Sequence, residues 1–357
     1  MDGVDAALLE VSEKKIRLVS SHYSEYPENL IKRLKKSTEE KATFTIDELG
    51  KLNVEVGAHF ADAANKLIEL SKIEAGEITA IGSHGQTIRH KPNGQFPFSL
   101  QLGNGPTIAV KTNIRTVCDF RSLDVARGGE GAPLIPPFQK WLMDLKLENN
   151  CIFLNIGGIA NITIIKKTEK LVGFDTGPGN CLMDFWVKKK FNQAFDSHGL
   201  IAASGEINFD YLRVLLKHPH FHKSSPKSTG FEEFNLSYIL TSLQKVTATL
   251  SDKDILATLS RLTAHTIASE IESNTSNSPT VYVFGGGLKN THLMTELSDL
   301  LPLNKIVSTS SLGIKPDFFE AAAFAWLAYM RISEKRVELT TNIDRQKILL
   351  GTIHVPH

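Results

Sequence analysis

Residues 151–180 read CIFLNIGGIANITIIKKTEKLVGFDTGPGN, and this stretch decides the fold class. The apolar run 151–156 predicts a buried strand that ends at Gly157-Gly158, a glycine pair typical of a tight turn. The apolar runs 162–165 and 171–174 predict a returning strand and a third strand. The stretch therefore predicts a three-strand meander around a glycine turn.

The segments that follow indicate an α/β protein. An apolar run at 281–284 predicts a strand that stops at three successive glycines. Helical patterns are found at 181–194, 236–250, 254–273 and 317–333. Strands that alternate with helices in this way are typical of a sheet flanked by helices.

The first half of the chain has a related pattern. It begins with a predicted β-hairpin over 4–19, continues with helices over 25–40 and 53–75, and reaches a short strand at 78–82 that leads into a polar loop. If the halves are duplicated units, a strand and a glycine turn are expected before Asp2, and the sequence does not contain them.

A length of 357 residues favours two lobes. The glycine- and proline-rich stretch 128–137 is the expected boundary or hinge. We therefore expect an N-terminal lobe over 1–127 and a C-terminal lobe over 128–357, whose last helix can pack back on the first lobe.

The composition is that of a soluble globular protein. It is 41% hydrophobic and 22% charged with a net charge of +1, so it indicates neither a nucleic-acid nor a membrane partner. Three widely spaced cysteines suggest a reducing compartment, and no apolar run approaches the length of a membrane span. We expect a cytoplasmic protein.

Two glycine-rich loops are candidates for binding a nucleotide. The loop 155–161 offers unshielded backbone N–H groups and two amide side chains, which suit phosphate oxygens, although a Gly-Gly pair is also typical of an ordinary hairpin turn. The loop 284–290 ends a strand and begins a helix, and its glycines would let a base or ribose lie against the backbone.

Asp175 is the candidate general base. It directly follows a buried strand and lies between glycines that would let a substrate approach closely. Phosphoryl transfer depends mostly on positioning and charge neutralisation, so one carboxylate near the acceptor would suffice. The alternative is an aspartate that caps the next helix.

Other polar segments have weaker signals. The stretches 82–90 and 119–124 carry donors and acceptors suited to a hydroxylated, acidic ligand, or they are solvated loops. The tract His218 to His222 lacks metal-ligand spacing and an adjacent carboxylate, so no metal site is predicted. Glu320 is either a helix-dipole residue or a ligand.

Taken together, the ordered segments resemble the anhydro-N-acetylmuramic acid kinases over nearly the whole chain. The segments are MDGVDA at 1–6, GSHGQTIRH at 82–90, QLG at 101–103, DFR at 119–121, GGEGAPLIP at 128–136, NIGGIAN at 155–161, GFDTGPGN at 173–180, KSTG at 227–230, GGG at 285–287 and PDFFEAAAFAWLA at 316–328.

The resemblance implies a two-lobed actin-like fold, related to hexokinase and the heat-shock-70 ATPases, whose mixed sheets are flanked by helices and whose cleft closes on ATP and sugar. It implies that ATP and Mg²⁺ are used to open the 1,6-anhydro ring with water and to phosphorylate O6. The product would be N-acetylmuramic acid 6-phosphate, formed in cell-wall recycling by a homodimer. Another sugar as acceptor, or a non-catalytic sugar-binding protein, is the alternative.

The resemblance also assigns residue roles. Asp175 would be the base, and Glu320 would hold the sugar or assist Asp175. The remaining implied contacts are with the sugar for His84, Gln86, Thr87, Arg121, Gly177 and Asn180, and with the nucleotide for Asp2, Gly3, Asn155, Gly157, Gly158, Asn161, Gly285, Gly286, Gly287 and Asn290. The family's first phosphate loop, rich in glycine, serine and threonine, is expected just before Asp2 and is not found there.

Overall fold

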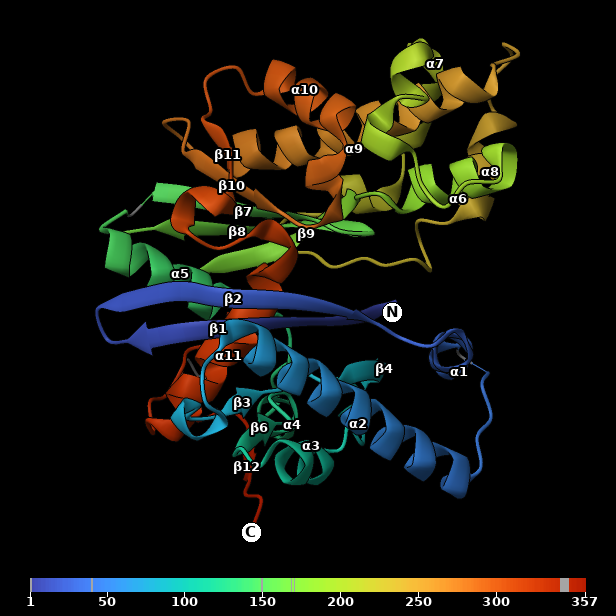
Figure 1. Ribbon diagram of the computed structural model, residues 1–357. Helices are drawn as coiled ribbons and strands as arrows, with labels where there is room; N and C mark the ends of the chain where they lie inside the picture. The colour runs from blue at the N-terminus through green and yellow to red at the C-terminus, as the bar shows by residue number, and fades with distance from the viewer. Residues whose placement is uncertain (1, 40, 149, 168, 170, 341–346) are drawn as a thin grey trace. The chain divides into compact units, whose positions relative to one another are not determined.

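The computed structural model describes residues 2–357 except 40, 149, 168, 170 and 341–346; Met1, in the first family-like segment, therefore lies outside the described residues. Two compact units are formed, unit 1 by residues 1–147 with 313–357 and unit 2 by residues 148–312. The units divide at Leu147 and Glu148 rather than in the glycine-rich stretch, and the last helix belongs to unit 1. The expected mixed α/β fold is confirmed (Figure 1).

Unit 2 is built on one five-stranded mixed sheet, in the order β11-β10-β7-β8-β9. Its β7–β8–β9 meander is antiparallel, whereas β10 and β11 run parallel to β7. The strands are β7 (Asn150–Ile156), β8 (Ile159–Lys166), β9 (Val172–Pro178), β10 (Thr280–Phe284) and β11 (Ile306–Ser308).

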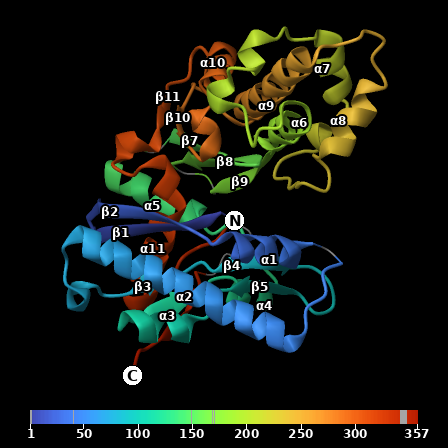
Figure 2. The same ribbon diagram turned by 45° about the vertical axis from the view of Figure 1, so that its right-hand side comes forward.

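The helices of unit 2 lie on one side of this sheet (Figure 2). They are α6 (Cys181–Phe191), α7 (Phe209–Leu215), α8 (Leu236–Leu243), α9 (Asp252–Asn274) and α10 (Thr291–Leu300). The long helix α9 contacts β8 and β9 directly, and α6, α7 and α10 contact α9. The buried residues of α9, such as Leu259 and Ile267, pack with Ile152 and Leu154 of β7 in the core.

Unit 1 contains more, and shorter, elements. They are β1 (Gly3–Ser12), β2 (Lys15–Glu25), α1 (Glu28–Thr38), α2 (Ile46–Ser71), β3 (Ile81–Gly82), β4 (Gln86–Lys91), β5 (Phe98–Leu102), α3 (Gly105–Thr112), β6 (Thr116–Cys118), α4 (Ser122–Ala126), α5 (Pro136–Lys146), α11 (Phe319–Ile332) and β12 (Thr352–His354). Short 3-10 turns join several elements in both units.

Among the described strands of unit 1, β1–β2, β12–β6–β3 and β4–β5 form separate small sheets. The antiparallel hairpin β1–β2 resembles β8–β9, and the parallel pair β3–β6 resembles β10–β11. Among the described strands, β1 pairs only with β2, and β3 pairs only with β6. A cavity of about 280 Å³ lies against β1, β3, α2 and α11. In unit 2, β7 lies between β10 and β8, the strands that correspond to β3 and β1. The edges of β1 and β3 therefore carry backbone N–H and C=O groups with which another strand could pair.

Several boundaries differ from the sequence prediction. Helix α2 begins at Ile46 because Thr45 and Glu48 form a capping box, a signal that the helical periodicity does not contain. The expected strand 78–82 is reduced to Ile81–Gly82, because its partner β6 spans only three residues. The expected polar loop after Gly82 contains β4, which pairs with β5.

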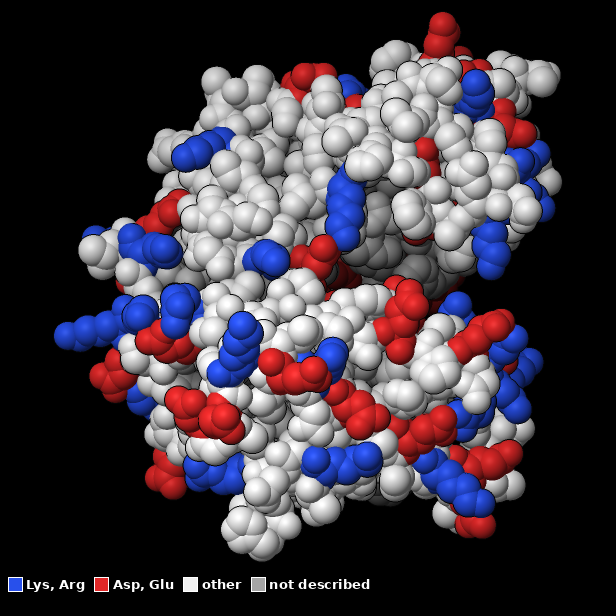
Figure 3. Space-filling model, in the orientation of Figure 1, with Lys and Arg blue, Asp and Glu red and all other residues white. Residues whose placement is uncertain are grey.

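The surface of unit 1 carries charges of both signs. Lys and Arg side chains are interspersed with Asp and Glu side chains over α1 and α2 on the face shown in Figure 3. Such mixing does not provide the basic face typical of nucleic-acid binding. Within the described part of the chain, no helix combines the length and apolar character needed to cross a membrane.

Candidate active site

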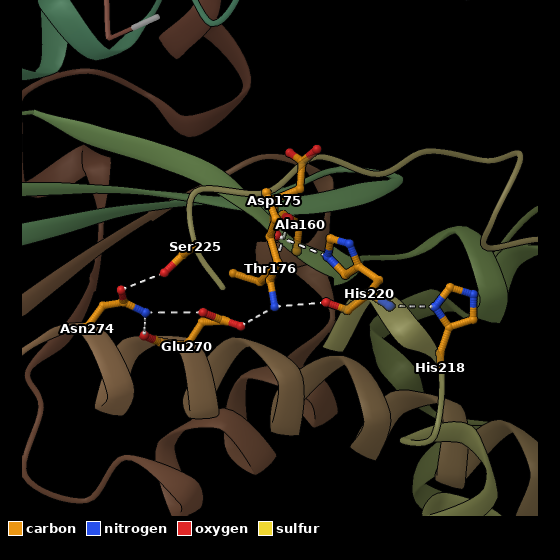
Figure 4. Close-up of polar contacts among 9 residues, drawn as sticks. Ala160, Asp175, Thr176, His218, His220, Ser225, Glu270 and Asn274 are labelled. Carbon is orange, nitrogen blue, oxygen red and sulfur yellow. Dashed lines mark hydrogen bonds and ion pairs between the residues drawn. The ribbon is translucent and has the colours of Figure 1, made fainter. Parts of the chain in front are cut away.

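The Asp175 carboxylate shares one face of the unit 2 sheet with two amide side chains. Asp175 of β9 is in register with Asn161 of β8, which is in register with Asn155 of β7. Residues directly opposite on neighbouring strands point to the same face. Thr176 points the other way, and its Oγ1 donates to the Ala160 carbonyl at 3.2 Å. Accordingly, the Asp175 carboxylate points away from α9 in Figure 4.

Asp175 does not cap α6, because the N-cap residue of that helix is Asn180. Instead, Asp175 Oδ2 accepts a hydrogen bond from the Thr229 backbone N–H at 3.0 Å. Burial raises the pKa of Asp175 to about 6, the Thr229 N–H opposes this rise, and the negative charge of Glu232 adds to it. At pH 7 the Asp175 carboxylate is therefore mostly ionised.

Glu232 provides a direct test of this electrostatic environment. Glu232 is exposed, so Glu232→Gln removes a negative charge near Asp175 without disturbing the core. The pKa of Asp175 should fall, and the acid limb of the kcat/KM pH profile should move to lower pH. Asp210→Asn is the matched control, since it neutralises an exposed carboxylate on α7 that pairs with Arg213. An acid limb that moves equally in both variants, or in neither, would contradict this assignment.

The Gly157-Gly158 turn is held by the loop that follows Asp175. The Gly158 carbonyl accepts from Gly179 N at 2.9 Å, and the Gly157 carbonyl accepts from Asn180 N at 2.8 Å and from Asn180 Nδ2 at 3.0 Å. A Cβ on Gly179 would lie 2.3 Å from the Gly157 carbonyl oxygen, so only glycine fits there. The turn is thus a hairpin turn whose position is fixed by residues 179–181.

The second glycine loop packs against the end of β7. Gly285 has a φ of +85°, and a Cβ there would lie 2.4 Å from Asn155 Oδ1. A Cβ on Gly287 would lie 2.2 Å from Ile156 Cγ2, whereas Gly286 has open space around its Cα. Glycine at the first and third positions therefore lets the two loops approach, and Gly286 leaves an accessible backbone surface.

Two other predicted residues have evident structural roles. The Asn290 side chain accepts from Leu293 N at 3.0 Å and caps α10. Gly177 has a φ of +149°, and a Cβ there would lie 2.8 Å from Phe221 Cε1. Both residues therefore shape the unit 2 loops.

In unit 1, His84 and Arg121 form a half-buried polar pair. Arg121 Nη2 lies 2.7 Å from His84 Nε2, and Arg121 Nη1 donates to the Gly131 carbonyl at 2.7 Å. The His84 ring lies against Phe324 with 4.5 Å between ring centres. Burial and the Arg121 charge lower the pKa of His84 to about 3, so the ring is neutral and Nε2 accepts from the guanidinium.

The unit 1 cavity is lined by carboxylates as well as apolar groups. Asp5, His84, Gln86 and Glu320 all line it. Desolvation by neighbouring groups and the Asp5 charge raise the pKa of Glu320, and the Arg121 charge opposes this rise. The residue as a whole is nevertheless exposed, so desolvation of its carboxyl group is only partial. Glu320 therefore has an environment suited to hydrogen bonding with a hydroxylated ligand.

Of the remaining unit 1 residues, Thr87 and Gly3 lie on strands that contribute to the lining of this cavity, and Asp2 directly precedes β1. Thr87 is on β4, where its Oγ1 accepts from Gln101 Nε2 at 3.2 Å. The Asp2 carbonyl accepts from Tyr26 N at 2.9 Å. A Cβ on Gly3 would lie 2.4 Å from the Ser24 carbonyl, so Gly3 permits the close start of the β1–β2 hairpin. Asp2 and Gly3 thus have backbone roles in this hairpin.

Sequence reasoning missed the residues that surround Asp175. The Asp175 N–H donates to the Lys227 carbonyl at 2.9 Å, and its own carbonyl lies 3.2 Å from His220 Nε2. The KSTG segment at 227–230 contained the only signal, because it includes Lys227 and Thr229. Neither the contact with Asp175 nor the role of His220 follows from that pattern.

The sequence comparisons identify the family. A family model for anhydro-N-acetylmuramic acid kinase matches residues 1–355. The chain belongs to this family. An anhydro-N-acetylmuramic acid kinase from Shewanella amazonensis is 44% identical over 329 residues, covering 92% of this chain and 88% of the relative. One from Saccharophagus degradans is 41% identical over 360 residues, covering 99% and 96%.

Comparison with solved structures gives a weaker similarity. The activator of 2-hydroxyisocaproyl-CoA dehydratase from Clostridium difficile, with bound ADPNP, has a TM-score of 0.45 and 12% identity, over 93% of this chain and 96% of that chain. Membership of the kinase family rests on the sequence matches. They confirm the expected enzyme class, a phosphotransferase that acts on a sugar, and do not favour a kinase of another sugar or a non-catalytic binder.

Proposed function

We propose that the protein uses ATP and water to convert 1,6-anhydro-N-acetylmuramic acid into N-acetylmuramic acid 6-phosphate, with Asp175 as the general base. The observation that supports this role is the Asp175 carboxylate, which shares a sheet face with Asn155 and Asn161 and whose pKa is raised by burial to about 6. Such a group is ionised at pH 7 and is still basic enough to accept a proton.

The reaction balances as follows. Asp175 takes a proton from water while the water oxygen bonds to C1 of the sugar, and the C1–O6 bond breaks. O6 bonds to the γ-phosphorus of ATP, and the bond from that phosphorus to the β,γ-bridging oxygen breaks to release ADP. The charge that develops on O6 is taken up by the phosphoryl group, so bond cleavage and phosphoryl transfer assist each other.

The nucleotide is assigned to the glycine loops of unit 2. Gly157 and Gly158 would face the phosphates, and the open backbone at Gly286 would lie against the adenosine. The amides of Asn155 and Asn161 lie on the same face as Asp175 and can donate to phosphate oxygens.

Mg²⁺ fits this arrangement as a partner of the phosphates. The described residues include no group of three or more His, Cys, Asp or Glu side chains that could hold a metal ion. Magnesium bound to nucleotides commonly keeps several water ligands and needs few protein ligands, which is compatible with this result. When bound, the ion would neutralise phosphate charge.

The sugar is assigned to the polar residues of unit 1. His84, Gln86 and Glu320 line its cavity and offer donors and acceptors for hydroxyl groups, and Thr87 lies on the same strand as Gln86. Arg121 contacts His84, and a guanidinium is a natural partner for the lactyl carboxylate of a muramic acid. Gly177 and Asn180 of unit 2 are the other proposed contacts.

Arg121→Lys tests the proposed carboxylate contact. Loss of the guanidinium fork should raise the KM for the anhydro sugar about 10- to 100-fold, because hydrogen bonds to charged groups contribute about 1.5–3 kcal/mol. The KM for ATP should change little. Arg17→Lys, at an exposed position of β2, is the control.

A second substrate separates recognition from structural damage. 1,6-Anhydro-N-acetylglucosamine has no lactyl carboxylate, so Arg121→Lys should impair its turnover much less. Equal loss with both sugars would show that Arg121 acts only through its contacts with His84 and Gly131.

We also propose the wider context that the family implies. The protein would act in the cytoplasm as a homodimer and would return muramic acid to metabolism during peptidoglycan recycling. The overall reaction is tested by incubating the protein with Mg²⁺, ATP and the anhydro sugar. Mass spectrometry should detect N-acetylmuramic acid 6-phosphate and ADP in equal amounts; ADP without phosphorylated sugar would contradict the proposal.

A further inference from the structure

Behind Asp175 lies a buried ion pair that connects two distant parts of unit 2. Lys227 Nζ lies 2.5 Å from Glu270 Oε1, and their side chains are only 2% and 15% exposed. Burying two charges carries a large desolvation cost, so a pair of this kind is weak evidence for stability alone. A buried pair can instead fix one specific arrangement of the chain, and its connections indicate which arrangement is fixed here.

Lys227 is connected to Asp175 by two routes. Its carbonyl accepts from the Asp175 N–H at 2.9 Å, and its Nζ donates to the His220 carbonyl at 3.1 Å. His220 Nε2 in turn lies 3.2 Å from the Asp175 carbonyl, and because a carbonyl only accepts, Nε2 carries the proton. The Asp175 N–H is thus bonded to Lys227 itself, and the Asp175 carbonyl to His220, which the Lys227 side chain contacts.

The same segment also reaches the Asp175 carboxylate. Thr229, two residues after Lys227, donates its backbone N–H to Asp175 Oδ2 at 3.0 Å. The position of this N–H therefore depends on where residues 227–229 lie, and the Lys227 side chain is the buried anchor of that segment.

Helix α9 provides the fixed side of the connection. Glu270 lies on α9, and its Oε2 accepts from Asn274 Nδ2 at 3.1 Å. Asn274 Oδ1 accepts from Ser225 Oγ at 2.8 Å. Figure 4 shows Ser225, Asn274 and Glu270 on one side of Asp175 and His220 on the other. The segment 220–229 is therefore tied to α9 on both sides of Pro226.

We propose that Lys227 is a positioning residue for the catalytic carboxylate. With Glu270 it fixes residues 220–229 on α9, so that the Thr229 N–H holds Asp175 in one orientation. This proposal rests on the proposed function of Asp175 as the base. Lys227 itself contacts no reacting group, because its Nζ is bonded to Glu270 and to the His220 carbonyl.

The test is the double variant Lys227→Met/Glu270→Gln. Both replacements are uncharged and similar in shape, so the variant removes the pair without leaving one buried charge alone. The matched control is Lys190→Met/Asp252→Asn, which removes a partly exposed pair, 3.2 Å apart, at the other end of α9. The control should retain the activity and pH profile of the wild type.

In the test variant, kcat should fall about 10- to 100-fold while the KM for ATP changes little, since small misplacement of a catalytic group is costly. The acid limb of the kcat/KM profile should move to higher pH, because Asp175 loses the N–H that stabilises its ionised form. Among the described residues, the titratable groups beside Asp175 or its partners include His220, Lys227, Glu232 and Glu233, and the two glutamates are unchanged in the variant. The single variant Lys227→Arg keeps a cation beside Glu270, so its kcat should lie between that of the double variant and that of the wild type.

A folded double variant with wild-type kcat and an unmoved acid limb would overturn the proposal. If the double variant does not fold, Asn274→Ala, which removes the hydrogen bonds to Glu270 and Ser225 and leaves no buried charge unpaired, should give a smaller shift of the acid limb in the same direction, and no shift would overturn it. Carbon-13 NMR titration of the Asp175 carboxyl group tests the positioning role of Lys227 separately from the role of Asp175 as the base. A higher Asp175 pKa in the double variant than in the wild type supports the positioning role even if the wild type forms no phosphorylated sugar.

Discussion

Asp175→Asn is expected to lower kcat for N-acetylmuramic acid 6-phosphate formation by about 100- to 10,000-fold, the usual contribution of a general base. The substitution keeps the shape of the side chain and an oxygen that can accept from Thr229 N. The amide, unlike the carboxylate, cannot accept a proton from water, so the substitution removes only the basic group. Because burial already disfavours the charged form of Asp175, the neutral amide should not destabilise the fold, and the Tm should change by only a few degrees at most.

Asp184→Asn is a closely matched control for this experiment. Asp184 lies on α6 of the same unit, and burial likewise raises its pKa to about 6. Asp184 lies outside the row of paired strand residues formed by Asn155, Asn161 and Asp175. The control variant should retain most of its activity. Equal losses in the two variants would show that neutralising any buried carboxylate of unit 2 impairs the enzyme, and would contradict a specific role for Asp175.

Gly179→Ala should have the second large effect, and we expect it to weaken nucleotide binding. The added Cβ would lie 2.3 Å from the Gly157 carbonyl oxygen and 3.2 Å from Ala160 N, both backbone atoms that cannot rotate away. The turn at Gly157-Gly158 must therefore shift. We expect a rise of about 10- to 100-fold in the KM for ATP, and a loss of about 1–3 kcal/mol in stability from overpacking.

Gly50→Ala is the control for adding a methyl group. Gly50 lies in α2, and a Cβ there would meet no heavy atom within 4 Å. Alanine favours the helix, so this variant should be at least as stable as the wild type. A folded Gly179→Ala protein that binds ATP with unchanged KM would show that the position of this turn does not determine nucleotide affinity.

The meander of unit 2 is the part of the fold that the sequence predicts best. Continuous apolar runs separated by a glycine pair leave few alternatives, and β7, β8 and β9 lie close to their predicted positions. The prediction was poorer in unit 1. The stretch 83–90 has only one deeply buried apolar side chain, Ile88, so its strand β4 resembles a polar loop in sequence.

The candidate base is similarly visible in the sequence, whereas its surroundings are not. Asp175 is identified by the strand and glycines around it. The hydrogen bonds from Thr229 and to Lys227 join residues about 50 positions apart, and only the packing of 220–229 on α9 brings them together. The pKa of Asp175 depends on that burial, so residue type and spacing alone could not predict it.

The central claim, that Asp175 activates water to attack C1 of the anhydro sugar, is tested most directly by running the reaction in H₂¹⁸O. N-Acetylmuramic acid 6-phosphate, incubated separately in the labelled water, corrects for exchange at C1. We expect product with one ¹⁸O on C1 and none in the phosphate group, formed about 100- to 10,000-fold more slowly by Asp175→Asn. Unlabelled product, label in the phosphate group, or labelled product formed by Asp175→Asn at the wild-type rate would contradict it.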